Sequence, residues 1–369
     1  MKIPALALAA GFFVSCATAS FHRVDRTLDE GRYEESARLL EDERSSLYGS
    51  GDGILYYLDR GMLTHYAGLY AESSELLEAG ERAIEDAYTK SIVQELGTYL
   101  LNDTVRDYAG EDYEDVYINT FNALNYYYRG DLEEALVEIR RMNNKVRNLA
   151  AKYGVTRSVL QQKALEESLP IPPNPQAPSA FNDSALARYL GMLFYRGTGR
   201  FDDARIDGDY LRLAFANSPV LYPHPLPASL EEELEIPPGM ARLNFLAFAG
   251  LSPVKKANTI RLPTGRSYIK ISLPELVYRP SSTARIEVVF DGGRHVALEL
   301  LESIQTIAGE TYKAREAVIY LRSIIRGSLK GISSAVLDSM AEESEGNASA
   351  IYGLLSLGAQ IFAEASEKA

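Results

Sequence analysis

Residues 124–139 read LNYYYRGDLEEALVEI, and this stretch indicates the fold of much of the chain. A Tyr-rich run of helical period ends at Gly130, and a second helical run opens with acidic residues. Negative charge suits the start of a helix, where unpaired backbone N–H groups create a positive potential. Glycine adopts the left-handed backbone that a tight turn after a helix needs. We therefore expect two antiparallel helices joined by a Gly turn.

The same pattern, Gly-x-(Tyr/Leu/Phe)-x-x-(Ala/Ser), occurs four times, starting at Gly31, Gly68, Gly130 and Gly199. It resembles the tetratricopeptide repeat, in which small and aromatic residues of one helix pack against Ala and a large apolar residue of the next. The matching positions are Tyr57, Gly61, Gly68, Tyr70, Ser73 and Leu77 in one copy, and Ala123, Tyr126, Gly130, Ala135 and Ile139 in the next. The glycines are 37, 62 and 69 residues apart, so the resemblance implies irregular repeats with inserted helices. The alternative is a general helical domain that uses Gly turns.

After Pro238 the period changes from helical to alternating, which is typical of strands. Residues 267–274 (SYIKISLP) and 284–300 (ARIEVVFDGGRHVALEL) predict strands, and Gly292-Gly293 predicts a hairpin turn. The predicted apolar faces carry Ile269, Ile271 and Leu273 in the first stretch, and Ile286, Val288, Phe290, Val296, Leu298 and Leu300 in the second. Residues 242–250 (RLNFLAFAG) predict a further strand. We expect a mainly α chain of the α+β class: helical hairpins, one small antiparallel sheet of three or four strands, then C-terminal helices.

Proline-rich strips mark the expected joints between these parts. The predicted divisions are a signal segment (1–15), a helical repeat domain (16–165), a linker (166–182), a further helical hairpin (183–216), a second linker (217–239), a small β domain (240–301) and C-terminal helices (302–369). The two strips are either plain linkers or extended segments that lie across the concave face of the repeats.

The N-terminus predicts export and a lipid anchor. Lys2 precedes the apolar run Ile3–Val14, which is too short to span a bilayer as a helix. The run ends in Phe13-Val14-Ser15-Cys16, which resembles a bacterial lipobox and contains the only cysteine of the chain. The resemblance implies cleavage before Cys16 and acylation there, and each buried methylene adds about 0.8 kcal/mol of membrane affinity. By resemblance to the enterobacterial sorting rule, Ala17 in place of Asp implies the outer membrane. The alternative is an ordinary signal peptide cleaved within residues 17–20.

Composition and motifs argue against several classes of function. The formal net charge of −13 disfavours binding to nucleic acid. One cysteine allows neither an intrachain disulfide nor a thiolate metal cluster, and the four histidines are far apart in the sequence. The chain has no nucleotide-binding Gly loop, paired-histidine metal motif or nucleophile elbow. We therefore expect no enzymatic activity, no cofactor and no bound metal.

Two clusters are candidate binding surfaces. In residues 110–147, we expect Asn119, Asn125 and Tyr126 on one helix to face Arg140, Arg141 and Asn143 on the next and to bind a partner protein. The alternative is a solvated surface with tyrosines filling the grooves between helices. In residues 315–330, Arg315, Arg322, Arg326 and Lys330 share one helical face. This basic face either pairs with the chain's own acidic helices or binds an anionic partner.

The same 110–147 region is similar to a family of bacterial envelope lipoproteins with tetratricopeptide-like helices. The matching residues are Tyr113-Glu114, Asn119, Phe121, Ala123-Leu124-Asn125-Tyr126, Gly130-Asp131, Ala135, Val137-Glu138, Arg140-Arg141 and Asn143. The resemblance implies a scaffold or adaptor, lipid-anchored at the outer membrane and facing the periplasm, that binds other envelope proteins. Alternatives are an accessory activator or enzyme in cell-wall or secretion processes, and a peptide- or solute-binding module.

Overall fold

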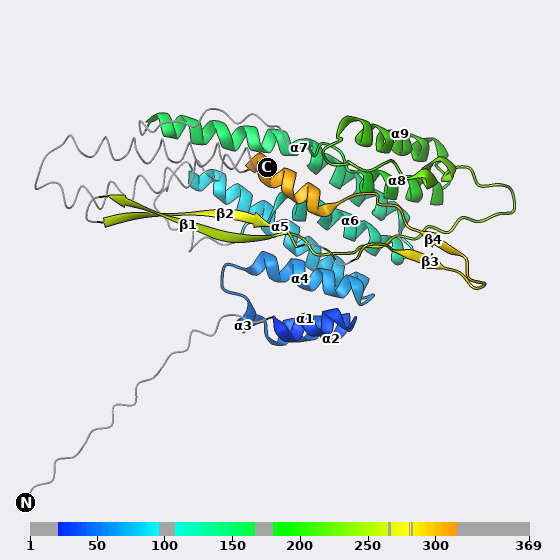
Figure 1. The fold of residues 1–369 in the computed structure, drawn as a ribbon, viewed down its shortest axis with the longest axis horizontal. Helices are drawn as coiled ribbons and strands as arrows, with labels where there is room; N and C mark the ends of the chain where they lie inside the picture. Colours follow the sequence, from blue (N-terminus) through cyan, green and yellow to red (C-terminus); the bar gives the residue numbers. More distant parts are fainter. Residues whose placement is uncertain are drawn as a thin grey trace, which may run out of the picture.

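The computed structural model describes residues 21–95, 108–166, 180–264, 267–279, 281 and 283–315, and it is mainly helical (Figure 1). Helices that follow one another in the sequence pack as antiparallel pairs. The pairs are α1 (His22–Asp29) with α2 (Tyr33–Asp42), α4 (Gly53–Tyr66) with α5 (Tyr70–Glu95), α6 (Asp112–Tyr128) with α7 (Leu132–Glu166), and α8 (Ala185–Gly197) with α9 (Phe201–Asn217). The short α3 (Arg44–Leu47) and the 3-10 helix η2 (Ala228–Glu232) lie in connections, and residues 304–315 form a further helix.

The four predicted Gly turns are confirmed, and all four have the same geometry. Gly31, Gly68, Gly130 and Gly199 have φ of 72°, 78°, 83° and 75°. At each turn the Gly N–H donates to the carbonyl three residues earlier, and the N–H of the next residue donates to the carbonyl five residues earlier. In one of them Asp131 N donates to Tyr126 O at 2.9 Å. This arrangement satisfies carbonyls at the end of the first helix and reverses the chain.

Three of the pairs, α4–α5, α6–α7 and α8–α9, share one apolar core. The largest cluster of buried side chains runs from Ile54 in α4 to Leu211 in α9 and includes Ile307. A smaller cluster joins α1, α2 and α3 to α4 through residues such as Leu40 and Leu63. The second proline-rich strip also packs on the main core, because Leu221, Tyr222 and Leu230 are buried in it.

Close packing inside a pair depends on a small residue in α4. A Cβ atom added at Gly61 would lie 2.8 Å from Leu77 Cδ2 on the facing helix α5. Neighbouring helices can approach this closely only where one of them lacks a side chain. This is the contact that the repeat pattern predicts between Gly61 and Leu77.

The strands form two separate ribbons, so the expectation of a single sheet of three or four strands is wrong. β1 (Val254–Thr264) pairs with β2 (Ser267–Val277), and β3 (Glu287–Val289) pairs with β4 (His295–Ala297), both antiparallel. The hairpin turn between β3 and β4 is confirmed, with Gly292 at φ 95° and Gly293 at φ 81°. Residues 242–250 are not a strand: they have no ladder partner among the described residues, and their apolar side chains line a cavity over the helices.

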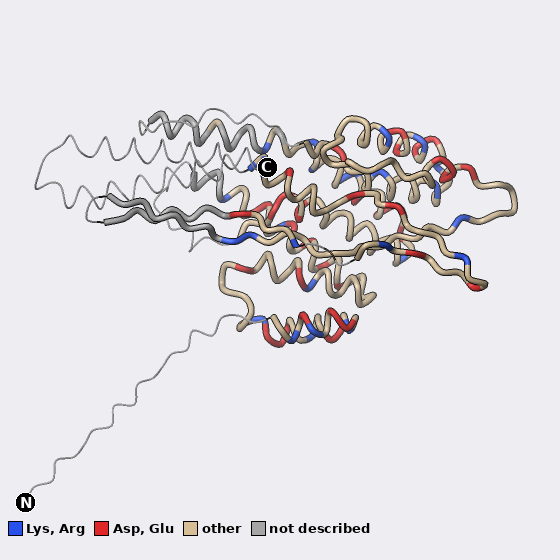
Figure 2. The backbone as a smooth tube through the Cα atoms, viewed as in Figure 1, with Lys and Arg blue, Asp and Glu red and all other residues tan. Residues whose placement is uncertain are grey.

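Charge is unevenly distributed among these elements. Figure 2 shows acidic and basic residues crowded on α1, α2 and α9, whereas the extended segments that cross the helices are mostly uncharged.

The predicted C-terminal helix begins within residues 304–315, and its continuation lies outside the described residues.

Candidate functional site

Asn119 lies in a buried polar network rather than on a binding surface. It is fully buried, and its side-chain amide donates to Glu81 Oε1 at 3.1 Å and to Glu138 Oε2 at 2.7 Å. Arg141 pairs with both carboxylates, and Lys145 lies 2.6 Å from Glu81. Burial opposes ionisation of Glu81, but the Lys145 ammonium and Arg141 guanidinium still hold its pKa below the usual range. The network therefore ties α5, α6 and α7 together.

Asn125 belongs to a second internal link. It is fully buried, its Oδ1 lies 2.7 Å from His65 Nδ1, and its amide donates to Ser73 Oγ at 2.9 Å. Burial lowers the pKa of His65, so this imidazole is neutral at pH 7. The link joins α4, α5 and α6 across two helical pairs.

The predicted partner-binding cluster is therefore mostly internal, which corrects the sequence interpretation. Asn143 is also buried, Tyr126 is half-buried beneath Arg129, and only Arg140 and Arg141 are exposed. Polar residues in a repeat can face either a partner or the next helix. Here the neighbouring helices α4 and α5 supply the hydrogen-bond partners: Glu81 for the amide of Asn119, and His65 and Ser73 for that of Asn125.

The predicted basic face is described only at Arg315. Its guanidinium contacts Glu111 at 3.1 Å and Asp112 at 3.4 Å, at the start of α6. At this position the basic face pairs with the chain's own acidic residues. Arg322, Arg326 and Lys330 lie outside the described residues, as does Cys16.

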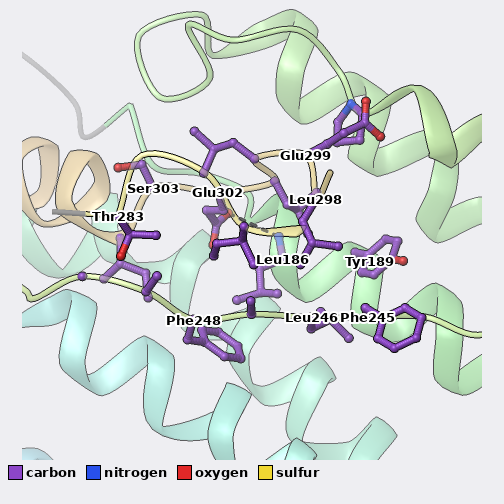
Figure 3. A pocket seen from close by; sticks show the side chains of 18 of the residues that line it. Leu186, Tyr189, Phe245, Leu246, Phe248, Thr283, Leu298, Glu299, Glu302 and Ser303 are labelled. Atoms are coloured by element: carbon purple, nitrogen blue, oxygen red, sulfur yellow. Dashed lines mark hydrogen bonds between the residues drawn. The ribbon is translucent and has the colours of Figure 1, made fainter. Parts of the chain in front are cut away.

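A large cavity lies where sequence reasoning placed no site. Its volume is about 1150 Å³, and it separates the helical layer from two extended segments (Figure 3). We call residues 242–252 the inner strap and residues 283–303 the hairpin strap, which contains β3 and β4. The floor comes from α4, α6 and α8, the first helices of three consecutive pairs, through residues such as Met62, Phe121 and Leu186.

The walls that the straps contribute are apolar and accessible. The six residues predicted on the apolar face of 284–300 all line the cavity. Figure 3 shows Phe245, Leu246 and Phe248 of the inner strap on one side and Leu298 of the hairpin strap on the other. Leu243 keeps 75% of its surface exposed and Phe245 48%, which is unusual for large apolar side chains gathered in one place.

One carboxylate fastens the hairpin strap to the helical layer. Glu302 accepts hydrogen bonds from the hydroxyls of Tyr117, Tyr222 and Ser184 and from the backbone N–H of Leu186. Ser184 caps the start of α8, where a negative charge is favoured. Burial raises the pKa of Glu302, although these donors oppose the rise.

A second acidic group lies in the cavity wall at the start of α6. Glu114 accepts from Tyr108 Oη at 2.6 Å and from Glu111 N at 2.8 Å, which completes a capping box. Burial is the main cause that raises the pKa of Glu114 to about 7. The Glu114 carboxyl in this wall therefore titrates near neutral pH.

Sequence reasoning missed Glu302 and the inner strap as parts of a site. Nothing local marks Glu302, because its donors come from α6, α8 and the second proline-rich strip. The inner strap did have a signal, the apolar-rich run of residues 243–249, but such a run also predicts a strand.

Comparisons with protein families, with curated proteins and with solved structures find no match to this chain. None of the described helices is long and apolar enough to cross a membrane. Within the described ranges, no three His, Cys, Asp or Glu side chains are grouped to hold a metal ion. Apolar side chains make up much of the lining of the cavity, and both acidic and basic groups lie among them.

Proposed function

We propose that the chain is a lipid-anchored adaptor of the bacterial cell envelope, which holds other envelope proteins in the cavity beneath its straps. The observation that carries the proposal is the accessible apolar lining of this cavity, with Leu243 and Phe245 among its most exposed large side chains. Exposed apolar surface of this kind is typical of protein interaction sites. The lipobox-like residues before Cys16 support the anchor.

The shape of the cavity favours a polypeptide segment over a small solute. Its volume of about 1150 Å³ lies near the upper end of the range for small-molecule pockets, about 300–1,000 Å³. The lining is elongated, because it follows the straps from α4 across α6 to α8. An extended segment of a partner protein fits such a shape.

Site-specific photo-crosslinking tests the binding site. A photoreactive phenylalanine analogue replaces Phe248 in the cavity or, as the control, Phe201, which is 56% exposed at the start of α9. In intact cells we expect a discrete adduct with an envelope protein from position 248 and none from position 201. Identical adducts from both positions, or none from 248, would contradict the proposed site.

Acylation tests the anchor independently. Metabolic labelling with an alkyne fatty acid should label the wild-type chain and leave Cys16→Ala unlabelled and released from the membrane fraction. A Cys16→Ala chain that still carries the label would disprove the lipid anchor at this residue. Photo-crosslinking in the Cys16→Ala background then shows whether partner binding needs the anchor.

A further inference from the structure

The ladder of β1 and β2 stops where the cavity begins. Its last pair is Val254 with Val277, but the two chains stay together for several more residues. Arg279 Nε donates to Ser252 O at 2.7 Å, and a Cβ atom at Gly250 would lie 3.3 Å from Ser281 Cβ. These contacts continue the register of the ladder.

Beyond Gly250 the two straps lose the register of the ladder. That register would place Phe245 opposite Ile286, yet the Phe245 ring instead meets the Phe290 ring, at a centroid distance of 6.2 Å. The straps are therefore out of register here, and both of them line the cavity that lies over the helices.

Both straps have backbone groups that belong to no ladder among the described residues. In the part of the chain that the structure describes, residues 243–248 make no backbone–backbone hydrogen bond. In the hairpin strap, Phe290 N donates to Arg294 O and Leu298 N donates to Ile286 O, so these residues point their backbone groups toward β4. Because orientation alternates along an antiparallel strand, Glu287 and Val289 point theirs away, to the open edge.

From this geometry we infer that the cavity binds its partner by strand insertion: an extended peptide segment enters between the inner strap and β3 and hydrogen-bonds to both. The inference rests on the proposed function, since the segment would belong to the envelope protein that the adaptor holds. Backbone groups supply affinity in this mode of recognition, and alternate side chains supply specificity. Leu246, Phe248 and Val288 would receive the apolar side chains of the segment.

Charge at the rim indicates one further property of the segment. Within the described residues, Arg279 and Arg294 line the cavity without a carboxylate partner. The carboxylates that line it all accept hydrogen bonds inside the chain: Asp59, Glu114, Glu232, Glu233, Glu299 and Glu302. Arg294 lies over the Phe290 ring, 5.8 Å from its centroid. The segment that fits is therefore apolar and β-forming, with an acidic residue at an end.

Backbone methylation of a bound peptide tests the insertion. A displayed library of random nine-residue peptides is selected on the full chain in detergent. An enriched peptide is then synthesised with N-methyl groups on alternate residues, in each of the two possible phases. A strand between two edges uses both sets of N–H groups, so we expect each series to weaken binding at least tenfold. Hydrogen exchange should slow at residues 243–250, Glu287 and Val289.

A proline variant removes a single donor from the open edge. Val289→Pro deletes the N–H that points away from β4, whereas Val289→Ala keeps it. We expect at least a tenfold loss of peptide affinity for the first and less than twofold for the second. Should Val289→Pro disturb the β3–β4 ribbon, hydrogen exchange in the wild-type chain decides the question.

Two results would overturn the inference. One is a peptide that binds equally well with and without N-methyl groups, which would mean recognition by side chains alone. The other is that no selected peptide protects the two strap edges from exchange. Photo-crosslinking from position 248 distinguishes these failures from failure of the adaptor proposal. If an envelope protein is captured there but peptide binding does not depend on backbone N–H groups, the adaptor proposal holds and the strand insertion is wrong.

Discussion

Glu302 shows how much one side chain can contribute to the position of a strap. Three hydroxyls and one backbone N–H donate to its carboxylate. Glu302→Ala leaves these buried donors unsatisfied, so we expect the free energy of unfolding to fall by about 3 kcal/mol. Urea denaturation of the two proteins measures the difference.

The neighbouring Glu299 is the control for this substitution. It accepts from the backbone of Ala228 and Ser229 at an exposed position, where water can replace it. Glu299→Ala should therefore cost less than about 1 kcal/mol. Equal losses in the two variants would mean that Glu302 has no special role in holding the hairpin strap.

Glu114 gives the protein a defined pH dependence. Its pKa is about 7 in the folded protein, against an ordinary value of 4.5. Because proton binding favours the folded state, this stabilisation is complete below about pH 4.5 and is lost as the pH rises through about 7. Glu114→Gln keeps the capping box but cannot titrate.

The stability difference between wild type and Glu114→Gln should therefore change by about 3 kcal/mol between pH 4 and pH 8, with the wild type losing more. Denaturant unfolding at several pH values measures this, and a carbon NMR titration of the Glu114 carboxyl gives the pKa directly. A difference that stays constant with pH, or a carboxyl that titrates near 4.5, would contradict the prediction.

For single residues, the sequence predicts a structural role correctly when that role depends on neighbours in the sequence. The turn glycines are an example, since the chain reversal is decided within six residues. Asn119 is the opposite case: its partner Glu81 is 38 residues away, so no local pattern distinguishes an internal amide from a partner-binding one. The same holds for Asn125 and His65, which are 60 residues apart.

Among the elements, the helical pairs depend on the conformation of their Gly turns rather than on space around them. Gly130 has φ of 83°, and a Cβ atom there would meet nothing within 4 Å. Gly130→Ala should therefore cost about 1 kcal/mol of unfolding free energy through backbone strain alone. Gly130→Asn should cost less, because Asn tolerates the left-handed conformation better.

Gly53 provides a matched control, at which the same substitution should raise rather than lower the free energy of unfolding. It opens α4 with equal space around it, but its φ is not in the left-handed region. Gly53→Ala should raise the unfolding free energy by about 0.5 kcal/mol, because Ala restricts the unfolded chain and suits a helix. Thermal unfolding of both variants tests the pair, and losses of similar size would show that the turn conformation is not what matters.

For the strands, the alternation of apolar and polar residues predicts where extended segments lie in the sequence, but not which segments pair. The apolar faces of β2 and of residues 284–300 follow from their sequence, and the latter face lines the cavity. Residues 242–250 are also rich in apolar side chains and predict a strand, yet they make no ladder among the described residues. Alternation reports which side chains are covered, whereas pairing depends on where another strand lies, and here the neighbouring strap has moved out of register.

For the whole molecule, the arrangement of straps over helices predicts that closing the cavity abolishes binding. The rings of Phe245 and Phe290 are the point where the two straps meet. In Phe245→Cys/Phe290→Cys, a short bis-maleimide linker would join the straps and block entry between them. We expect the linked protein to give no photo-adduct from position 248, while the same variant without linker still gives one.

The comparison variant places the same chemistry inside one ribbon. Val289 and His295 lie opposite each other in β3 and β4 and are not among the residues that line the cavity, so Val289→Cys/His295→Cys can be linked without joining the two straps. This protein should keep most of its adduct. If linking Phe245→Cys/Phe290→Cys leaves the adduct unchanged, the partner reaches position 248 without passing between the straps, and the helical floor alone is the binding surface. If both linked proteins lose the adduct equally, the ribbon itself must move for a partner to bind, because joining its two strands does not join the straps.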